Sequence, residues 1–400
     1  MTADKKPDYA EKETLLYEKL SSGRVRCNTC QRRCTIEEGH LGWCKTRLNQ
    51  KGILYTLIYG KVSSWMVSPI EKKPMFHYYP GSRWLSLGTF GCNFRCPGCQ
   101  NWEISHTRMD MNIRDYSYIS PEECVNLAEK YDCFGISWTY NEPTIWFEYT
   151  LETAKLVKSP LSTHHSLLTN YVTNGFITPE ALDTIGPYLD SFRVDIKGFS
   201  KKTYQKIAHI PDFTPLEKTI PKFRSGRNRA IAENSLTGFT GILGVTKRAK
   251  DKWNMHIEIV TNVIPTVNDD KSELTDLANW IKTDLGENTP WHVTRFIPYF
   301  HPVRNSVLSN GVEWADLPVT PVKTLEQARE IGLNTGLRYV YLGNVPGHPA
   351  ENTYCPNCHK LLIERNGISI TDYQLKGNHC PDCQTVISGH FPVLPRFKSL

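Results

Sequence analysis

Short apolar runs alternate with longer amphipathic stretches through most of the chain. The runs are bounded by Gly, Pro, Asn and Asp, which is typical of strands, and the stretches between them carry helix-capping signals. Strands are predicted at residues 84–90, 134–139, 167–172, 192–196, 256–263, 292–297 and 337–342. Helices are predicted at residues 121–131, 143–157, 201–207, 272–283 and 325–335, with a further one opening at Thr178-Pro179. This alternation predicts an α/β fold with a parallel sheet, closed or partly closed as a barrel.

Both ends of the chain depart from this alternation. We expect a Cys-rich N-terminal segment at residues 1–60, a core at residues 61–347 and a zinc-ribbon-like or rubredoxin-like unit at residues 348–400. A helix is predicted at residues 11–20 of the charged lead-in. Within the core, residues 224–253 break the rhythm with a run of basic side chains. Such a run is more typical of a solvated surface insertion than of a binding patch.

Composition narrows the class of protein. The 400 residues are 40% hydrophobic and 22% charged, which is ordinary for a globular protein. Residues 1–18 are polar and charged, so we expect no secretory signal, and no apolar run is long enough to span a membrane. The sequence therefore predicts a cytoplasmic protein with no membrane partner. The net charge of +6 is mild and does not indicate a nucleic-acid partner.

Thirteen cysteines in a chain expected to be intracellular favour metal sites over disulfides. Cys124 and Cys133 stand apart from the rest and are interpreted as small buried hydrophobes. The first cluster has four thiols within eighteen residues, which suits either one zinc ion or an auxiliary iron–sulfur cluster, and His40 could replace one ligand. The four thiols belong to Cys27, Cys30, Cys34 and Cys44.

The C-terminal cluster consists of two Cys-Pro-x-Cys knuckles separated by 21 residues. Each knuckle presents two thiolates to one ion, and the spacing is close to that of zinc ribbons. We therefore predict one structural tetrahedral site that holds zinc rather than a rubredoxin-like iron, with His359 and His379 as neighbours. The predicted ligands are Cys355, Cys358, Cys380 and Cys383.

The chain is organised around a third group, Cys92, Cys96 and Cys99, spaced C-x3-C-x2-C directly after the first predicted strand. Thiolates at such spacing hold iron–sulfur clusters. Three ligands on a four-iron cluster leave one iron with an open coordination position, at which chemistry can occur. A closed zinc site made of the three thiols and His106 is the alternative.

Polar residues gather where the predicted strands end. In parallel βα barrels the carboxyl ends of the strands meet at one face, and that face carries the active site. Six strands ending in this way predict a single site, whatever the family. The segments are residues 91–101, 139–144, 173–175, 195–198, 265–269 and 295–298.

The three-cysteine loop resembles the signature of the radical S-adenosylmethionine (SAM) superfamily. Over residues 22–385 the chain is similar to the radical SAM enzyme of the AmmeMemoRadiSam group, itself similar to pyruvate formate-lyase activating enzymes. Gly98 and Pro265-Thr266 depart from the family pattern, which has an aromatic residue and a Pro-Gly turn there. The segments that carry the resemblance are residues 70–74, 91–103, 139–144, 194–198 and 343–347, together with both terminal cysteine runs.

The resemblance implies a partial (β/α)6 TIM-like barrel, a radical SAM core whose [4Fe-4S] cluster is held by Cys92, Cys96 and Cys99. Glu142 is expected near the SAM amine, and Asp195 and Lys197 near its methionyl end. Because Asp195 and Lys197 lie two residues apart on a strand they share a face, and a purely structural ion pair is their alternative role. The full set implied for SAM binding is Asn141, Glu142, Asn174, Asp195, Lys197 and Pro265.

The resemblance also implies a reaction. An electron donor such as flavodoxin or ferredoxin reduces the cluster, SAM is cleaved to methionine and a 5′-deoxyadenosyl radical, and the radical takes a hydrogen atom from the substrate. The similarity to activating enzymes suggests a glycine Cα–H on a partner protein. Two other functions stay open: radical SAM modification of a small molecule or peptide, and a non-enzymatic zinc protein that binds RNA through its basic insertion and terminal ribbon.

Overall fold

The structure of the protein, a computed structural model, describes residues 12–107, 116–159, 167–210, 238–298 and 314–392. Its centre is an eight-stranded sheet in the order β8-β9-β11-β12-β13-β14-β15-β16. The seven strands from β9 to β16 are parallel to one another, and β8 pairs with β9 in the antiparallel sense. The predicted parallel sheet is therefore confirmed, and β8 and β16 are its two edges. The strands are β8 (Ser64–Pro69), β9 (Arg83–Gly88), β11 (Gly135–Trp138), β12 (Leu168–Thr173), β13 (Ser191–Asp195), β14 (His256–Val263), β15 (Trp291–Arg295) and β16 (Val340–Gly343).

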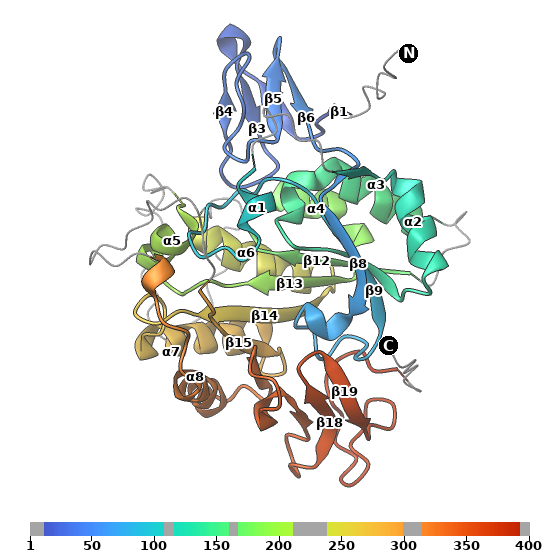
Figure 1. Ribbon diagram of the computed structural model, residues 1–400, viewed down its shortest axis with the longest axis vertical. Coiled ribbons are helices and arrows are strands. Elements are labelled where there is room, and N and C mark those ends of the chain that lie inside the picture. The colour runs from blue at the N-terminus through green and yellow to red at the C-terminus, as the bar shows by residue number, and fades with distance from the viewer. Residues whose placement is uncertain (1–11, 108–115, 160–166, 211–237, 299–313, 393–400) are drawn as a thin grey trace.

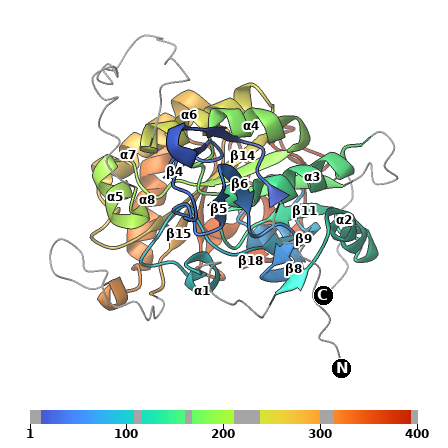
Figure 2. The ribbon, with the colours of Figure 1, turned by 90° about the horizontal axis from the view of Figure 1, so that it is seen from above.

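Helices connect the parallel strands and lie along the outer side of the sheet (Figures 1 and 2). The predicted capping box is present, because the Ser120 side chain accepts from the Glu123 backbone while the Glu123 carboxylate accepts from the Ser120 backbone. A 3-10 turn, Pro143–Trp146, precedes α3. The helices are α1 (Trp102–Ser105), α2 (Pro121–Lys130), α3 (Phe147–Val157), α4 (Pro179–Ile185), α5 (Lys201–Ala208), α6 (Gly238–Asp251), α7 (Lys271–Trp280) and α8 (Val322–Thr335).

Helix α6 occupies the second half of the stretch expected to be a surface insertion. Ile242, Val245 and Ala249 of this helix are buried, and Arg248 pairs with Asp183 of α4 at 2.5 Å. This half therefore belongs to the helical cover of the sheet. The first half, residues 224–237, lies outside the described residues.

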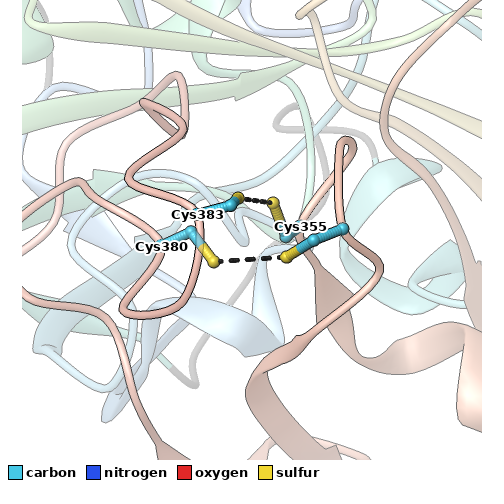
Figure 3. A group of neighbouring side chains, drawn as sticks. Cys355, Cys380 and Cys383 are labelled. Carbon is cyan, nitrogen blue, oxygen red and sulfur yellow. Dashed lines mark hydrogen bonds between the residues drawn. The ribbon is translucent and has the colours of Figure 1, made fainter.

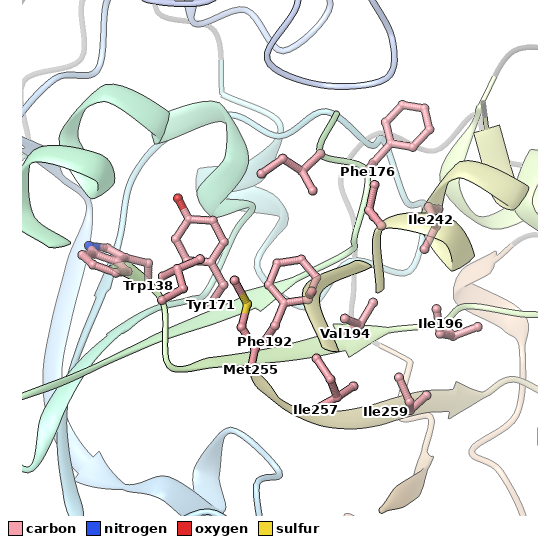
Figure 4. Close-up of a cluster of buried hydrophobic side chains, with 14 of the residues drawn as sticks. Trp138, Tyr171, Phe176, Phe192, Val194, Ile196, Ile242, Met255, Ile257 and Ile259 are labelled. Carbon is pink, nitrogen blue, oxygen red and sulfur yellow. The ribbon is translucent and has the colours of Figure 1, made fainter. Parts of the chain in front are cut away.

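The main core lies between the sheet and its helices. Tyr171, Phe192 and Ile257 project from neighbouring strands and are at most 5% exposed. They pack with Ile242 of α6 in one continuous cluster (Figure 4). Burial of this kind fixes the strand register, and the register in turn brings the carboxyl ends of the parallel strands to one edge. None of the helices in the described ranges combines the length and apolar character that a membrane crossing needs.

The N-terminal unit consists of two three-stranded antiparallel sheets at one end of the long axis of the molecule (Figure 1). The helix predicted at residues 11–20 is wrong, because residues 12–13 and 17–19 are strands that pair with residues 55–56 and 25–27. Two further short strands, β7 (Lys61–Val62) and β10 (Ser117–Tyr118), pair with each other. The two N-terminal sheets comprise β1 (Lys12–Glu13), β6 (Ile53–Thr56) and β5 (Arg47–Gln50), and β2 (Tyr17–Lys19), β3 (Val25–Cys27) and β4 (Thr35–Ile36).

A buried ion pair ties the N-terminal unit to the core. The Arg47 guanidinium of β5 donates to both carboxylate oxygens of Glu148 in α3, at 3.0 and 2.9 Å. The two side chains are only 2% and 1% exposed. The guanidinium also donates to the Ile145 carbonyl. A buried pair of this kind holds both partners in place because neither charge can be solvated alone.

The C-terminal unit, with β17 (Thr353–Tyr354), β18 (Leu361–Asn366) and β19 (Ser369–Tyr373), lies at the opposite end (Figure 1). Its buried Arg365 donates to the Phe76 carbonyl at 3.2 Å and lies 4.1 Å from the centre of the Phe76 ring. His77 contacts the Ser388 carbonyl through Nδ1 and the Tyr341 hydroxyl through Nε2, both at 2.6 Å. A carbonyl can only accept, so Nδ1 carries the proton and Nε2 accepts from Tyr341.

The buried carboxylate of Glu258 binds the segment of Phe76 and His77, which contacts the C-terminal unit, to the core sheet. Glu258 of β14 accepts from the backbone N–H groups of Phe76 and His77, at 3.0 and 2.8 Å. It also accepts from His292 at 2.6 Å and His256 at 3.0 Å. Burial alone would raise the pKa of Glu258, but the two histidine hydrogen bonds outweigh it and hold the pKa well below its usual range. The carboxylate therefore stays charged and keeps its four donors.

Removal of Arg47 tests the N-terminal attachment. We expect Arg47→Met to lower the free energy of unfolding by about 3–5 kcal/mol, because it leaves the Glu148 carboxylate buried without its partner. The double change Arg47→Met/Glu148→Leu should restore part of this loss. The matched control is Arg338→Met, which breaks an exposed pair with Glu287 at 2.7 Å and should cost no more than about 1 kcal/mol. Equal losses for the two single variants in anaerobic denaturant unfolding would contradict the structural role of the buried pair.

The C-terminal contact predicts a pH dependence. Burial lowers the pKa of His77 from 6.5 to about 4, so between these values the unfolded chain binds a proton that the folded chain excludes. The stability that His77 contributes is present above pH 6.5 and is lost as the pH falls toward 4. The measurement is the difference in the free energy of unfolding between wild type and His77→Asn. Burial also raises the pKa of Glu71 to about 7, which changes stability with pH in the opposite direction. Both proteins contain Glu71, so the subtraction removes its effect. This difference should shrink by about 2 kcal/mol from pH 7 to pH 5; a difference that does not change with pH would refute the assignment.

Candidate active site

The three-cysteine loop leaves the carboxyl end of β9 and is closed around one guanidinium. Arg95 Nη1 donates to the carbonyls of Cys92, Phe94 and Ser105, at 2.9, 3.0 and 3.1 Å. Gly91 opens the loop with φ of +80°, and a Cβ there would meet the Cys44 carbonyl at 2.7 Å, so only glycine fits. The loop conformation is therefore fixed by contacts to its backbone.

Cys92, Cys96 and Cys99 are all half-buried. Within the described part of the chain, the C-terminal cysteines are the only group of three or more metal-ligating atoms that lie within 4.8 Å of one another. The three central thiols and His106 are therefore not arranged around a single point, as one zinc ion requires. A four-iron cluster binds each thiolate through a different iron, so wider spacing suits it.

The charge around these thiols also suits a metal group. Burial raises the pKa of Cys96 to about 12, and the Lys197 ammonium beside it acts in the opposite direction. A buried thiol with a raised pKa needs a positive centre to become a thiolate, and a metal cluster is such a centre.

The amides of Asn141 and Asn174 bind the cysteine loop itself. Asn141 donates to the Gly91 carbonyl at 2.8 Å and accepts from the Thr89 N–H at 3.1 Å. Asn174, at the end of β12, donates to the Asn93 side chain at 2.7 Å. The structure thus brings the ends of three neighbouring strands together at the loop.

Glu142 is fully engaged within the protein. Its carboxylate accepts from the backbone and hydroxyl of Thr144, from the Thr173 hydroxyl and from the Asn174 N–H. It is 1% exposed, and burial raises its pKa although these hydrogen bonds oppose the shift. The carboxylate ties the loop after β11 to the end of β12, and contact with a SAM amine stays a prediction.

Asp195 and Lys197 lie together at the end of β13, as their spacing predicts. The Asp195 carboxylate pairs with Arg193 and, at 3.4 Å, with Lys197. Burial would raise the pKa of Asp195, but Arg193 and Lys197 outweigh it and keep the pKa below its usual value. Both the acidic and the basic side chain are half-buried, so the pair presents two opposite charges close to Cys96.

Pro265 and Thr266 form the turn after β14. Thr266 adopts φ of +64°, a conformation that a β-branched residue rarely takes and that the glycine of a Pro-Gly turn takes freely. Its N–H donates to Asp269 at 2.9 Å, which stabilises the turn. Asn268, which the sequence placed only within a polar segment, joins this turn to the previous strand by donating to the Lys197 carbonyl at 2.8 Å.

An apolar wall lies beside the third cysteine. A Cβ at Gly98 would lie 3.2 Å from a ring carbon of Phe296 and 3.3 Å from one of Trp314. Cys96 packs against the same cluster, which includes Ile264 and Val267. The space next to Gly98 is therefore filled by rings from after β15; Phe296 lies in the predicted segment 295–298, whereas no local motif indicated Trp314.

The C-terminal cysteines meet at one point (Figure 3). The sulfur of Cys355 lies 3.5 Å from that of Cys383, and the sulfur of Cys358 lies 3.6 Å from that of Cys380. Four thiolates about 2.3 Å from one tetrahedral ion lie about 3.8 Å apart, so the arrangement fits one such ion. The two knuckles share their backbone geometry, since His359 and Gln384, each directly after the second cysteine, have φ of 60° and 59°.

The N-terminal cysteines line one pocket, although their spacing differs from that of the C-terminal four. Cys27 and Cys44 are buried, and Cys30 and Cys34 are half-buried. All four thiols face the same pocket, which also reaches Asn93 of the central loop. The two isolated cysteines, Cys124 and Cys133, are buried hydrophobes as predicted.

Comparison with known proteins agrees with this geometry. The family model of the radical SAM superfamily matches residues 87–277, which contain the cysteine loop and the ends of β11 to β14. An uncharacterized protein of Methanocaldococcus jannaschii is 37% identical over 374 residues, covering 93% of this chain and 97% of that protein.

Two solved structures are similar to parts of the chain. A domain of a pyruvate-formate lyase-activating enzyme from Bacteroides vulgatus has 13% identity and a TM-score of 0.35, covering 52% of this chain and 99% of that one. A radical SAM methyltransferase from Sphaerobacter thermophilus has 13% identity and a TM-score of 0.43, covering 68% of this chain and 71% of that one. Similarity at this level carries no argument about function. The family match over residues 87–277 and the cysteine loop at the carboxyl edge of the sheet show that the chain contains a domain of the radical SAM superfamily.

Proposed function

We propose that the protein is a radical SAM oxidoreductase of the activating-enzyme kind, in the AmmeMemoRadiSam group. It cleaves SAM reductively and uses the resulting 5′-deoxyadenosyl radical to take a hydrogen atom from a substrate. The observation that carries this proposal is the loop of Cys92, Cys96 and Cys99, which lies among polar strand ends at the carboxyl edge of the sheet.

Cys92, Cys96 and Cys99 would hold a [4Fe-4S] cluster, which when bound supplies one low-potential electron and an open iron for the methionyl part of SAM. The protein orients the bound molecule. Asp195 and Lys197 offer one acceptor and one donor, which suit the amine and the carboxylate of an amino acid.

The rest of the site excludes water and supports these two residues. Phe296 and Trp314 supply apolar surface beside Cys96, next to the turn at Pro265. Asn141, Glu142 and Asn174 serve first to position the loop, since their side chains bind other protein groups. Hydrogen bonds of this kind keep the reactive groups in a fixed position, and a fixed position lets the protein direct a radical to one hydrogen atom of the substrate.

The terminal units complete the proposal. In the described part of residues 348–400, Cys355, Cys358, Cys380 and Cys383 would hold a structural zinc ion within a ribbon, and the described part of residues 1–60 is a separate Cys-rich unit on the core. The ion would fix the two knuckles against each other and so stabilise the unit that docks on His77 and Phe76.

The substrate class follows by analogy with activating enzymes, and it is a glycine Cα–H of a partner protein, with flavodoxin or ferredoxin as electron donor in the cytoplasm. Modification of a small molecule or peptide is the second candidate. The non-enzymatic zinc alternative has less support, because the central thiols and His106 are not gathered around one ion and basic residues of α6 are paired with carboxylates, Arg248 with Asp183 and Lys247 with Asp251.

Loss of one central thiol tests the chemistry. Reduced anaerobically with SAM, the wild type should form 5′-deoxyadenosine and methionine. Cys96→Ala should lower this rate at least about a hundredfold, since loss of even the groups around metal ligands costs 10–100-fold. Cys133→Ala is the matched control, because it removes a buried thiol outside the site and should retain the activity. Equal activity in wild type and Cys96→Ala, or none in either despite a full complement of iron, would refute the proposal.

The apolar wall predicts the effect of restoring the family's aromatic residue. Gly98→Tyr should lower the free energy of unfolding by about 1–3 kcal/mol, because its side chain meets the rings of Phe296 and Trp314. It should also weaken SAM binding, measured by equilibrium dialysis. Gly98→Ala serves as the smaller step and should show a smaller effect. Tighter SAM binding by Gly98→Tyr with undiminished stability would show that the rings leave room for the tyrosine.

A further inference from the structure

The pocket at the N-terminal cysteines differs from the C-terminal metal site in the spacing of its sulfur atoms. In the C-terminal site, pairs of sulfurs lie 3.5 and 3.6 Å apart, near the spacing of about 3.8 Å that one tetrahedral ion imposes. Among the residues that the structure describes, no three ligand atoms of the N-terminal group lie within 4.8 Å of one another. The chain thus contains one set of four cysteines whose sulfur atoms lie close together and one set whose sulfur atoms lie further apart.

The four N-terminal thiols surround a pocket and do not converge on one position. All four cysteines line one small pocket, part of which is open to solvent. Arg32, Trp43 and Arg47 complete its wall. A single ion draws its four thiolates close together, whereas a cluster of iron and sulfide keeps them further apart, because each thiolate binds a different iron atom.

One of the residues that line the pocket carries a buried donor without a partner. Asn93 lines the pocket and is 0% exposed, and its Nδ2 has no acceptor within the described part of the chain. A buried N–H group without an acceptor is destabilising, so an acceptor at this position would stabilise the site. The sulfides of an iron–sulfur cluster are such acceptors, because N–H groups commonly donate to cluster sulfur. A zinc ion shielded by its thiolates offers no sulfide.

The pocket adjoins the central cysteine loop. Arg32 donates through Nε to the Asn93 carbonyl at 2.6 Å. Arg95, which closes the central loop, donates to the Trp43 carbonyl at 3.0 Å. The side chain of Arg32 also lies over the Trp43 ring at 4.1 Å. Two arginines therefore bind the N-terminal cysteine segment directly to the loop of Cys92, Cys96 and Cys99.

We infer that Cys27, Cys30, Cys34 and Cys44 bind a second iron–sulfur cluster, with Asn93 as a hydrogen-bond donor to its sulfur. The site is separate from the central one and does not require that the central site cleave SAM. Its metal content can therefore be tested even if the proposed function fails.

The test is metal analysis of the full chain after anaerobic reconstitution with iron and sulfide. The wild type should contain about six to eight iron atoms and one zinc per chain, because four belong to the central cluster and two or four to the second. Cys30→Ser/Cys34→Ser should lose two to four iron atoms and keep its zinc. Cys358→Ser/Cys383→Ser, the matched control, should lose zinc and keep its iron.

A second variant keeps the inference testable if Cys30→Ser/Cys34→Ser fails to fold. The triple change Cys92→Ser/Cys96→Ser/Cys99→Ser removes the central ligands, and the protein should still show an iron–sulfur EPR signal after reduction. Added SAM should leave that signal unchanged. About two zinc atoms per chain in the wild type, with no iron–sulfur signal in the triple variant, would overturn the inference and assign zinc to the pocket.

Discussion

The hydrogen bonds that hold the central cysteine loop are the constraint on which the site depends. Arg95 closes the loop from within, and Asn141 and Asn174 bind it to the ends of the two neighbouring strands. Parallel pairing puts these strand ends at one edge, and the buried core fixes the register that aligns them. The conformation of the loop is therefore fixed although the loop has little regular structure.

Both terminal units dock on the core through buried charged groups, and these contacts fix the position of each unit relative to the sheet. Arg47 meets Glu148 on one side of the molecule. On the other side Arg365 lies 3.9 Å from Glu71, and the Glu258 carboxylate accepts hydrogen bonds from the backbone N–H groups of residues 76 and 77. Buried charges are costly without their partners, so each contact specifies one arrangement of its unit. The N-terminal contact also places a second set of thiols beside the central loop.

The sequence predicts the parallel sheet because the periodicity of its strands and helices is local, and the capping box at Ser120 is confirmed. Helix α6 was not predicted, because the run of basic residues indicated a surface insertion. Its buried face consists of Ile242, Val245 and Ala249, which are spaced three and four residues apart, as on one side of a helix. The short N-terminal strands have no local signal, since they exist only through pairing with distant segments. Residue type also could not show that Glu142 is bound by other protein groups, because this depends on three-dimensional contacts.

The most direct test of the account is electron–nuclear double resonance on the reduced protein with SAM labelled by ¹⁵N at the amine and ¹⁷O at the carboxylate. The account predicts hyperfine coupling of both labels to the cluster held by Cys92, Cys96 and Cys99, because SAM would bind the open iron of this cluster through its methionyl part. The coupling should disappear in Cys96→Ala. A reduced, iron-loaded wild-type protein that shows no coupling to either label would contradict the central claim.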